Sequence, residues 1–300
     1  MSDEPIRRVA ILSDRIGYEE RGMLRAARAA GLEAQWIDDG ALCAGPIGLG
    51  MPAADLHLVR SRSYTRGAAL AALLEDGGAR TINCSTAIEV CQSKLATSRL
   101  LAREGVPTVD FRLVLSRADV EAALAAFGLP LVLKPILGGL GRRVLLVRDA
   151  DLLHATYDYV EHFAQSYDRV LMAQPFQPGA DVRAIVAGDE VLTAIVRRAG
   201  EDWRANVATG AVATSLQSCV ELQEIAARVA ATTGAAIFGL DLFRSGAGYV
   251  VGEVNHVPMF RAAAAVTGVD VAARIVDRLL AGALVPPAPR PPLAVANGAT

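Results

Sequence analysis

The stretch GLDLFRSGAGYVVGEVN, from Gly239 to Asn255, has the pattern of two strands joined by a turn at Ser245 to Gly248. Most of its residues are apolar, which predicts burial, yet the second strand ends with Glu253 and Asn255 only two positions apart. Because successive side chains of a strand point to opposite faces, these two project on the same side. Asp241, on the first strand, can lie opposite them across the short turn.

Two carboxylates and one carboxamide on one face of a sheet form a cluster of hard oxygen atoms. Such a cluster is typical of a Mg²⁺ site, because Mg²⁺ binds one or two carboxylates and completes its shell with water and substrate phosphates. The alternative is a solvated edge strand whose polar side chains face water. A magnesium site implies a polyphosphate ligand, so the rest of the chain should supply cations and a loop that holds phosphate.

Lys134 and the loop that follows it meet this requirement. The lysine lies inside the apolar strand LVLKP, where an unpaired ammonium group would be costly, so we expect a carboxylate or a bound anion beside it. The loop GGLGRR begins four residues later, and its glycines let backbone N–H groups approach phosphate oxygens closely. An ordinary turn is the alternative, but the combination favours phosphate binding by Lys134, Gly138, Gly139, Gly141 and Arg142.

Further candidates lie on either side of this loop. Lys94 is near the start of a helix in VCQSKLATSRLL and faces either solvent or a ligand. Arg183 and Arg197 recur on neighbouring strands of one predicted hairpin, where guanidinium groups can clamp a carboxylate or a transferred phosphoryl group. Ordinary surface charge is the alternative for both. Asn206, in WRANVATG, belongs to a loop that leads toward the predicted metal strands.

Composition excludes several classes of protein. The 300 residues are 52% hydrophobic and carry a net charge of -2, which gives no reason to expect nucleic acid or an anionic membrane as partner. The four cysteines and four histidines show no metal-binding spacing, which favours reduced thiols in a cytoplasmic protein. The charged N-terminus predicts no signal peptide, and no apolar run approaches the roughly 20 residues that span a bilayer.

The pattern of elements predicts an α/β protein with three lobes and a tail. Alternating strands and helices over residues 1–87 predict a small parallel sheet. Residues 88–170 begin with one long helix, Ile88 to Glu104, and form a central lobe around the glycine-rich loop. Residues 171–285 contain a hairpin with Gly188 and Asp189 at its turn, a helix, the two acidic strands and a closing helix. The proline-rich residues 286–300 are expected to be disordered.

The order of these motifs resembles that of the ATP-grasp ligases. The resemblance is carried by Lys94, then LVLKP-ILGGLGR, AQPF, DVRAIVAG, WRAN, GLDLF and GEVN. More narrowly, TINCSTAIEVCQSKLATSRLLAREGVPT and EVNH…F…TGVD look like the branch that joins an amino acid to the C-terminal glutamate of an amino-group carrier protein. That branch acts in lysine and arginine biosynthesis and is related to ligases that add glutamate to a ribosomal protein.

The resemblance implies an α/β ATP-grasp fold and an ATP-dependent ligase that forms an amide through an acyl-phosphate. It implies an N-terminal parallel domain, a central lid domain and a C-terminal antiparallel domain. ATP and two Mg²⁺ ions are the expected cofactors. The implied nucleotide contacts are Lys94, Lys134, Gly138, Gly139, Gly141, Arg142, Gln174, Pro175, Phe176 and Asp181, the metal ligands are Asp241, Glu253 and Asn255, and the catalytic residues are Arg183, Arg197 and Asn206.

The partners expected are an amino acid and a small acidic carrier protein, and a homo-oligomer is expected. Arg60, Arg62 and Arg66 in VRSRSYTRG are close in sequence and form either a docking patch for the acidic carrier or a solvated loop. His256 and Phe260, which follow the metal strand, are candidate substrate contacts.

Some positions depart from the family pattern. Relatives carry Arg-Gly-Gly where this chain has NVATGA with Thr209, and a glutamate where it has Pro175. The segment VPMFRAA after EVNH also differs, so the departures concern substrate contacts more than ATP contacts. Two alternatives stay open: a glutamate ligase that acts on a protein tail or a small molecule, and a nucleotide-binding relative without turnover. The intact Asp241, Glu253 and Asn255 set argues against the second.

Overall fold

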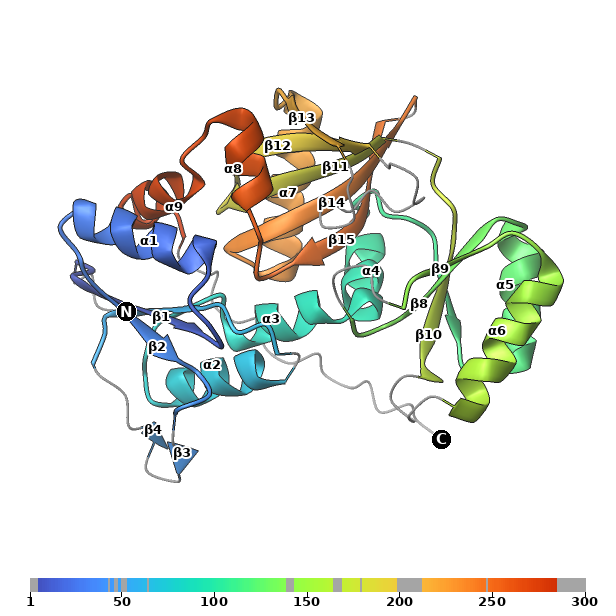
Figure 1. Cartoon of the computed structure of the whole chain (residues 1–300), viewed down its shortest axis with the longest axis horizontal. Helices are drawn as coiled ribbons and strands as arrows, with labels where there is room; N and C mark the ends of the chain where they lie inside the picture. The colour runs from blue at the N-terminus through green and yellow to red at the C-terminus, as the bar shows by residue number, and fades with distance from the viewer. Residues whose placement is uncertain are drawn as a thin grey trace, which may run out of the picture.

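The computed structural model places three large sheets side by side across the molecule, each with its own helices, and a separate two-stranded sheet in the N-terminal part (Figure 1). Their order in space differs from their order in the chain, because the sheet formed by the last third lies between the other two (Figure 1). The structure describes residues 5–42, 44–45, 48–49, 53–63, 65–138, 143–163, 169–178, 180–198, 212–246 and 248–284.

The N-terminal domain is the predicted small parallel sheet, with strand order β2-β1-β5-β6. Val9 and Ile11 of β1 point into the core that contains α1, whereas Ala10 and Leu12 pack against Leu74 of α2 on the other face. The elements are β1 (Arg8–Ser13), α1 (Tyr18–Ala29), β2 (Glu33–Asp38), the short pair β3 (Ala44–Gly45) and β4 (Gly48–Leu49), β5 (Leu56–Val59), α2 (Arg66–Asp76) and β6 (Thr81–Ile82).

The prediction of one helix from Ile88 to Glu104 is wrong, since two helices occupy this part of the chain. They are α3 (Ser85–Gln92) and α4 (Lys94–Arg103), separated by Ser93 in an extended conformation. Ser93 forms a β-bridge with Leu137, and its side chain caps α4 by accepting a hydrogen bond from Ala96 N at 3.2 Å. The extended residue Ser93 therefore joins the start of α4 to the segment that follows the strand containing Lys134.

The central lobe is an antiparallel sheet with order β7-β10-β8-β9. Its core lies between one face of the sheet and two helices, α5 and α6. The strand β10 pairs with β7 and β8, so this sheet extends beyond residue 170, where we expected the lobe to end. The elements are β7 (Arg112–Val114), α5 (Arg117–Phe127), β8 (Leu131–Pro135), β9 (Leu145–Val147), α6 (Ala150–Phe163) and β10 (Leu171–Pro175).

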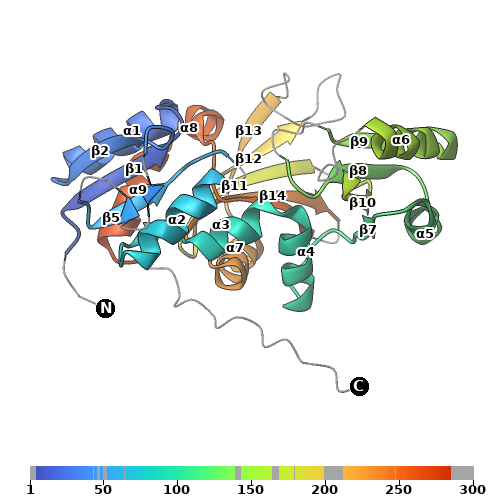
Figure 2. The same ribbon diagram turned by 90° about the horizontal axis from the view of Figure 1, so that it is seen from below.

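The C-terminal sheet is antiparallel, with order β13-β12-β11-β14-β15. One face packs against α3, α4 and α7, which share its core (Figure 2). The predicted hairpin is confirmed, with Gly188 at a φ of 65° in the turn between β11 and β12. The elements are β11 (Ala180–Ala187), β12 (Glu190–Arg198), β13 (Val212–Leu216), α7 (Val220–Thr233), β14 (Ile237–Ser245) and β15 (Gly248–Asn255).

Two last helices join this sheet to the N-terminal domain. The first, α8 (Arg261–Thr267), lies on the face of the C-terminal sheet opposite α7, and α9 (Val271–Leu280) packs beside α1 (Figure 1). Ile275 and Leu279 of α9 belong to the same core as Val9 and Met23. The end of the chain thus completes the first domain. None of the helices within the described ranges is long and apolar enough to span a membrane.

Candidate active site

One face of the C-terminal sheet gathers the charged residues that the sequence singled out. Val182, Leu240 and Val254 point toward α7, so their neighbours in the strands point the other way. The strand register pairs Asp181 with Arg197, Arg183 with Asp241, and Asp241 with Glu253. We call the group on this face, together with two lysines described below, the site cluster: Asp181, Arg183, Arg197, Asp241, Glu253, Asn255, Lys94 and Lys134.

A β-bulge at Gly252 brings Glu253 onto this face. Asp241 pairs with Glu253 but Leu242 pairs with Val251, so Gly252 is an extra residue in β15. Val251 and Val254 can then both enter the core although they are three positions apart. A Cβ at Gly252 would lie 2.7 Å from Cε2 of Phe243, so only glycine fits here without displacing that ring. The bulge is a feature that the strand pattern alone did not predict.

Asp241 is the centre of the site cluster. Arg183 Nη1 donates to its two carboxylate oxygens at 3.0 and 2.9 Å, and Arg197 Nη2 donates at 2.8 Å. Asn255 Nδ2 donates to Asp241 Oδ2 at 3.0 Å. Burial acts to raise the pKa of Asp241, but the two guanidinium groups outweigh it and hold the pKa below its usual range. Asp241 is therefore ionised at neutral pH.

Asp181 shares the guanidinium of Arg197. Arg197 Nε donates to Asp181 Oδ1 at 2.7 Å, and the side chains of this pair are 12% and 19% exposed. Burial raises the pKa of Asp181 to about 6, although Arg197 opposes the shift. Both arginines predicted to be catalytic are thus held in place by carboxylates of the same sheet.

Two buried lysines reach the site cluster from the other side. Lys94 Nζ lies 3.3 Å from Glu253 Oε1 and also donates to the carbonyl oxygen of Gly138. Lys94 N donates to Ile136 O at 2.9 Å, which fixes the start of α4 against the segment after β8. Lys134 is 8% exposed, and burial together with the charge of Lys94 lowers its pKa to about 8, against the opposing effect of Glu253 and Asp241.

The donor set fits Mg²⁺ that is completed by substrate phosphates. Within the described residues no three His, Cys, Asp or Glu side chains gather as a metal site. Asp241 and Glu253 provide two carboxylates, and Asn255 uses its amide nitrogen toward Asp241, which leaves its carbonyl oxygen for a cation. Few protein ligands are typical of Mg²⁺, which keeps water and phosphate oxygens in its shell. Four cations around three carboxylates also suit an anionic ligand.

The predicted adenine hinge leads out of the central sheet. Gln174 is buried, and its Nε2 donates to Val109 O at 3.5 Å. Pro175 pairs with Leu131, and Phe176 N donates to Pro130 O at 3.1 Å. Of the glycine-rich loop, Gly138 is described, is buried and accepts the hydrogen bond from Lys94. Asn206, Thr209, Gly139, Gly141 and Arg142 lie outside the described residues.

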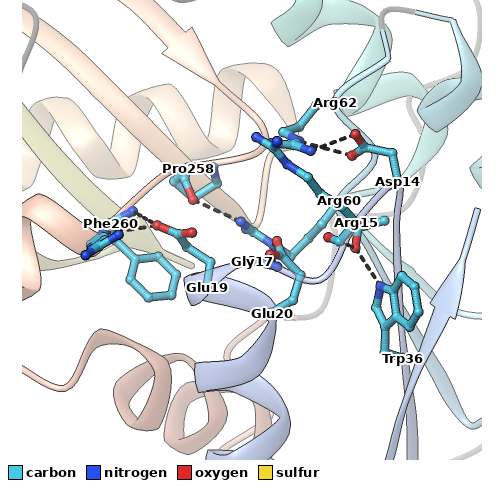
Figure 3. A network of polar contacts seen from close by, with 12 residues as sticks. Asp14, Arg15, Gly17, Glu19, Glu20, Trp36, Arg60, Arg62, Pro258 and Phe260 are labelled. Carbon is cyan, nitrogen blue, oxygen red and sulfur yellow. Dashed lines mark hydrogen bonds and ion pairs between the residues drawn. The ribbon is translucent and has the colours of Figure 1, made fainter. Parts of the chain in front are cut away.

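The predicted arginine patch is largely neutralised. Arg60 is 4% exposed and its Nε bonds Glu20 at 2.8 Å, so its assignment to an exposed docking surface is wrong. Arg62 forms two hydrogen bonds with Asp14 at 3.0 and 2.6 Å (Figure 3). Arg66 pairs with Asp39 at 2.6 Å. Arg62 and Arg66 stay partly exposed, with 30% and 45% of their side chains open to solvent.

Of the two candidate substrate contacts after β15, Phe260 is buried and His256 is partly buried. Phe260 is 1% exposed and belongs to the core between the domains, with its ring edge to face with Tyr18 at a centroid distance of 6.3 Å. The side chain of Phe260 therefore packs in the core, and the prediction that it contacts substrate directly is wrong. His256 lines a small cavity with Arg60 and Asn83, and burial and the charge of Arg60 lower its pKa to about 4.

Sequence reasoning missed three residues that hold this region. Glu19, Glu20 and Asn83 are all buried, and each contacts or supports the segment after Asn255 (Figure 3 for the two glutamates). Two acidic residues in the first turn of a helix are common, because they interact favourably with its N-terminus. No local pattern reveals that Glu19 meets residues 241 and 242 positions away.

A sheet face of carboxylates met by a lysine at the start of α4 and a lysine of the central sheet is the arrangement of an ATP-grasp protein. The model of the RimK-like ATP-grasp domain matches residues 91–279, and that of the LysX preATP-grasp domain matches residues 9–90. The chain belongs to the RimK-like ATP-grasp family, as the sequence predicted, and its class is that of ATP-dependent ligases that form C–N bonds.

Individual relatives agree with this assignment. The chain is 32% identical over 227 residues to the alpha-aminoadipate–LysW ligase LysX of Saccharolobus solfataricus, covering 75% of this chain and 82% of the relative. It is 33% identical over 288 residues to a probable alpha-L-glutamate ligase of Stenotrophomonas maltophilia, covering 91% and 98%. The crystal structure of a RimK domain ATP-grasp protein from Sphaerobacter thermophilus superposes with a TM-score of 0.75 at 28% identity, covering 90% and 98%. The predicted fold class is confirmed.

Proposed function

We propose that this ligase joins an amino acid to the C-terminal glutamate of a small acidic amino-group carrier protein, in amino-acid or specialised-metabolite biosynthesis. The observation that carries the proposal is the contact of the buried Lys94 with Glu253 on the face that bears Asp241. The buried Lys134 adds a second cation, whose pKa responds to the charges of Glu253 and Asp241. The carrier as acyl donor is supported by the similarity to the LysX enzyme, whose name states a LysW substrate. The match of residues 9–90 to the LysX preATP-grasp domain adds support from the N-terminal part of the chain.

The site cluster would bind the nucleotide through complementary charge. Lys94 and Lys134 would contact the phosphates of ATP, and an incoming phosphate can replace Glu253 as the partner of Lys94. Asp241, Glu253 and Asn255 would hold Mg²⁺, which supplies neutralising charge to the phosphates when it is bound. The backbone of Gln174 to Phe176 would lie against adenine, and Gly138, Gly139, Gly141 and Arg142 would cover the phosphates.

The reaction needs no covalent intermediate with the protein. An oxygen of the carrier carboxylate attacks the γ-phosphorus of ATP, the bond to the bridging oxygen breaks and ADP leaves. The amine nitrogen then attacks the acyl carbon, inorganic phosphate leaves with the electrons of the C–O bond, and the nitrogen loses its extra proton. Arg183 and Arg197, held by Asp241 and Asp181, would stabilise the negative charge that develops, with Asn206 beside them.

The proposal extends to the number of Mg²⁺ ions, to the residues that would meet the carrier and the amine, and to the assembly of the enzyme. Two Mg²⁺ ions would neutralise the negative charge of the ATP phosphates, as in other phosphoryl-transfer sites. Arg62 and Arg66 would steer the acidic carrier with the charge that their partners leave exposed, and His256 would support the amine side of the site. The reaction would take place in the cytoplasm, in a homo-oligomer.

Amide formation with a defined carrier tests the proposal. The purified chain is incubated with Mg-ATP, an acidic carrier that ends in glutamate and a panel of amino acids, and ADP, phosphate and the mass of the carrier are measured. We expect one ADP and one phosphate for each amide, and a carrier mass increased by one amino acid minus water. The same carrier without its terminal glutamate is the control. ADP release without a change in carrier mass would contradict the carrier as donor.

A second candidate function is that of a glutamate ligase acting on a different protein tail or a small molecule. It is favoured by the match to the Stenotrophomonas relative over 91% of this chain. The same assay separates the two, because this enzyme would consume glutamate with a donor other than the carrier and would leave the carrier mass unchanged.

A further inference from the structure

The segment from His256 to Arg261 connects the last candidate metal ligand to α8, and the N-terminal domain grips it at three points. Asn83 Nδ2 donates to His256 O at 3.0 Å, and Arg60 Nη2 donates to Pro258 O at 3.1 Å. Glu19 Oε1 accepts hydrogen bonds from Phe260 N at 3.0 Å and Arg261 N at 3.1 Å (Figure 3). Glu19, Arg60 and Asn83 are 1%, 4% and 2% exposed, and we call them the interdomain clamp.

All three side chains of the clamp bind backbone atoms of the segment. The path of the chain is therefore fixed whatever side chains the segment carries. Met259 is 43% exposed and Arg261 is exposed, with its guanidinium 5.8 Å from the centre of the Tyr18 ring. The clamp thus holds the backbone in one place and leaves these two side chains open to a ligand.

The clamp is itself supported from both domains. Arg60 Nε bonds Glu20 Oε1 at 2.8 Å, and Glu20 Oε2 accepts a hydrogen bond from Gly17 N at 2.8 Å. Asn83 also bonds Ala236 N, Ile237 N and Ile237 O at 2.7, 3.0 and 2.7 Å, which ties it to the start of β14. A rigid support of this kind is what a precisely placed binding segment requires.

The gripped segment lies against the site cluster. Pro258 and Arg183 both lie against Gly239, since a Cβ there would be 2.8 Å from Arg183 Nη2 and 3.4 Å from Pro258 Cβ. Arg183 is the residue that bonds both oxygens of Asp241. Pro258 and Arg183 therefore lie beside the same residue of β14. Burying Glu19 and Arg60 costs desolvation that apolar side chains would avoid, which points to a positional role for these charges.

We propose that Glu19, Arg60 and Asn83 are positioning residues that fix the segment from His256 to Arg261, and that this segment seats the amine substrate beside the site cluster. The N-terminal domain then sets amine recognition, while the two ATP-grasp lobes set ATP binding. The inference rests on the proposed function for its kinetic consequence, but the placement of the segment is measurable without any substrate.

The test compares Glu19→Ala with Glu19→Gln. The alanine variant loses both hydrogen bonds to the segment, whereas glutamine keeps an oxygen that accepts them without the charge. We expect Glu19→Ala to raise the KM for the amine about tenfold or more, the size of one charged hydrogen bond, while the KM for ATP changes less than about twofold. Glu19→Gln should stay within about threefold of the wild type for both.

Hydrogen–deuterium exchange of residues 257–263 is the second readout. We expect these amides to exchange faster in Glu19→Ala and at the wild-type rate in Glu19→Gln. Asp55→Ala is the matched control, because Asp55 also accepts two backbone N–H groups in this domain, from Arg7 at 2.9 Å and Arg8 at 2.8 Å, but touches neither the segment nor the clamp. Should Glu19→Ala not fold, Arg60→Lys serves, since it keeps a positive charge beside Glu20 and loses the nitrogen that reaches Pro258.

The outcomes separate this inference from the proposed function. Equal rises in KM for ATP and amine, or no rescue by glutamine, would overturn the positioning role. Unchanged exchange in residues 257–263 of Glu19→Ala would overturn it even if no amine proved to be a substrate. The exchange rates of residues 257–263 can instead change as expected in Glu19→Ala while the wild type forms no amide. That result would support the positioning of the segment and refute the proposed function.

Discussion

Two clusters of buried charge lie on either side of Asn255, and they are built differently. In the site cluster, Asp241 is shared among two arginines and an asparagine, and Lys134 forms no ion pair within the described part of the chain. In the interdomain clamp, Glu19 is satisfied by two backbone N–H groups, and Arg60 by Glu20 and a backbone carbonyl. The site cluster therefore keeps positive charge that a bound anion can compensate. The charged groups of the interdomain clamp already have protein partners and offer no charge to a ligand.

Removal of a polar group should therefore have different consequences in the two places. Removal of the Lys134 ammonium group from the site cluster should weaken ATP binding and leave stability nearly unchanged, because the ligand is its missing partner. In the clamp, removal of a hydrogen-bonding group should reduce stability first, because a fully paired buried network loses a member. Four substitutions in and around the site cluster test its side of this comparison, in order of decreasing effect.

Asp241→Asn should have the largest effect on activity. The substitution keeps the shape of the side chain but removes the charge on which Arg183, Arg197 and the proposed Mg²⁺ converge. We expect kcat to fall about 10²- to 10³-fold, the size measured when one preorganised electrostatic contact is removed from an active site. Rates of ADP formation check this, with Asp55→Asn as control, since Asp55 pairs with Arg8 in the N-terminal domain. A fall of less than about threefold would contradict the role given to Asp241.

Gly252→Ala should damage both stability and activity through the bulge. Its Cβ would meet the Phe243 ring at 2.7 Å, which displaces the strand that carries Glu253 and Asn255. We expect a loss of about 1–3 kcal/mol in the free energy of unfolding and a raised requirement for Mg²⁺. Gly246→Ala is the matched control, because a Cβ there has no neighbour within 4 Å. Equal behaviour of the two variants would show that the bulge is dispensable.

Lys134→Met should weaken ATP binding without loss of stability. Removing a buried ammonium group should change the free energy of unfolding by about 0 to +1 kcal/mol, while the KM for ATP rises about tenfold or more. Because the pKa of Lys134 in the folded chain, about 8, lies below the ordinary lysine value of 10.5, the unfolded chain binds one more proton than the folded chain between these two pH values. The wild type therefore gains stability as pH rises from 8 to 10.5, and its difference from the variant shrinks. Chemical unfolding of both proteins between pH 8 and 10.5 measures this difference in the free energy of unfolding. A difference that grows with pH would contradict the lowered pKa of Lys134.

Ser93→Ala should have the smallest effect. The side chain caps α4 through Ala96 N, and loss of such a cap costs about 1 kcal/mol. Since the break at Ser93 also places Lys94, we expect the KM for ATP to rise by less than about threefold. Thermal unfolding and ATP kinetics check both numbers, and Ser93→Thr, which keeps a hydroxyl group, should restore them. A variant as stable as the wild type would show that the β-bridge to Leu137 alone fixes the break.

The elements of the fold were largely predictable because each has a local signal. The alternation along β14 and β15, the turn at Gly188 and the helix at residues 220–233 all follow from periodicity or turn residues. The break at Ser93 was not predicted, because the residues around it favour helix and the bridge to Leu137 comes from a distant segment. The packing of α9 on α1 has the same origin, since it joins the two ends of the chain.

In the candidate site too, features with a local sequence signal were predictable, and features that depend on distant contacts were not. Glu253 and Asn255 on one face with Asp241 opposite were derivable from strand geometry, and the structure places all three there. The bulge that makes this possible and the partners of Glu19, Arg60 and Asn83 were not derivable. Arg60 and Arg62 are two residues apart in a charged stretch, yet only the fold buries one and exposes the other. The sequence alone does not reveal which groups surround a charged side chain in the folded protein.

The central claim is that the face bearing Asp241, Glu253 and Asn255 is where Mg²⁺ and ATP bind together. Calorimetric titration of a non-hydrolysable ATP analogue, with and without Mg²⁺, into the wild type and Glu253→Gln tests it most directly. The account predicts that Mg²⁺ tightens binding to the wild type about tenfold or more and that Glu253→Gln loses most of this gain. A Glu253→Gln variant with the full Mg²⁺-dependent gain would contradict it.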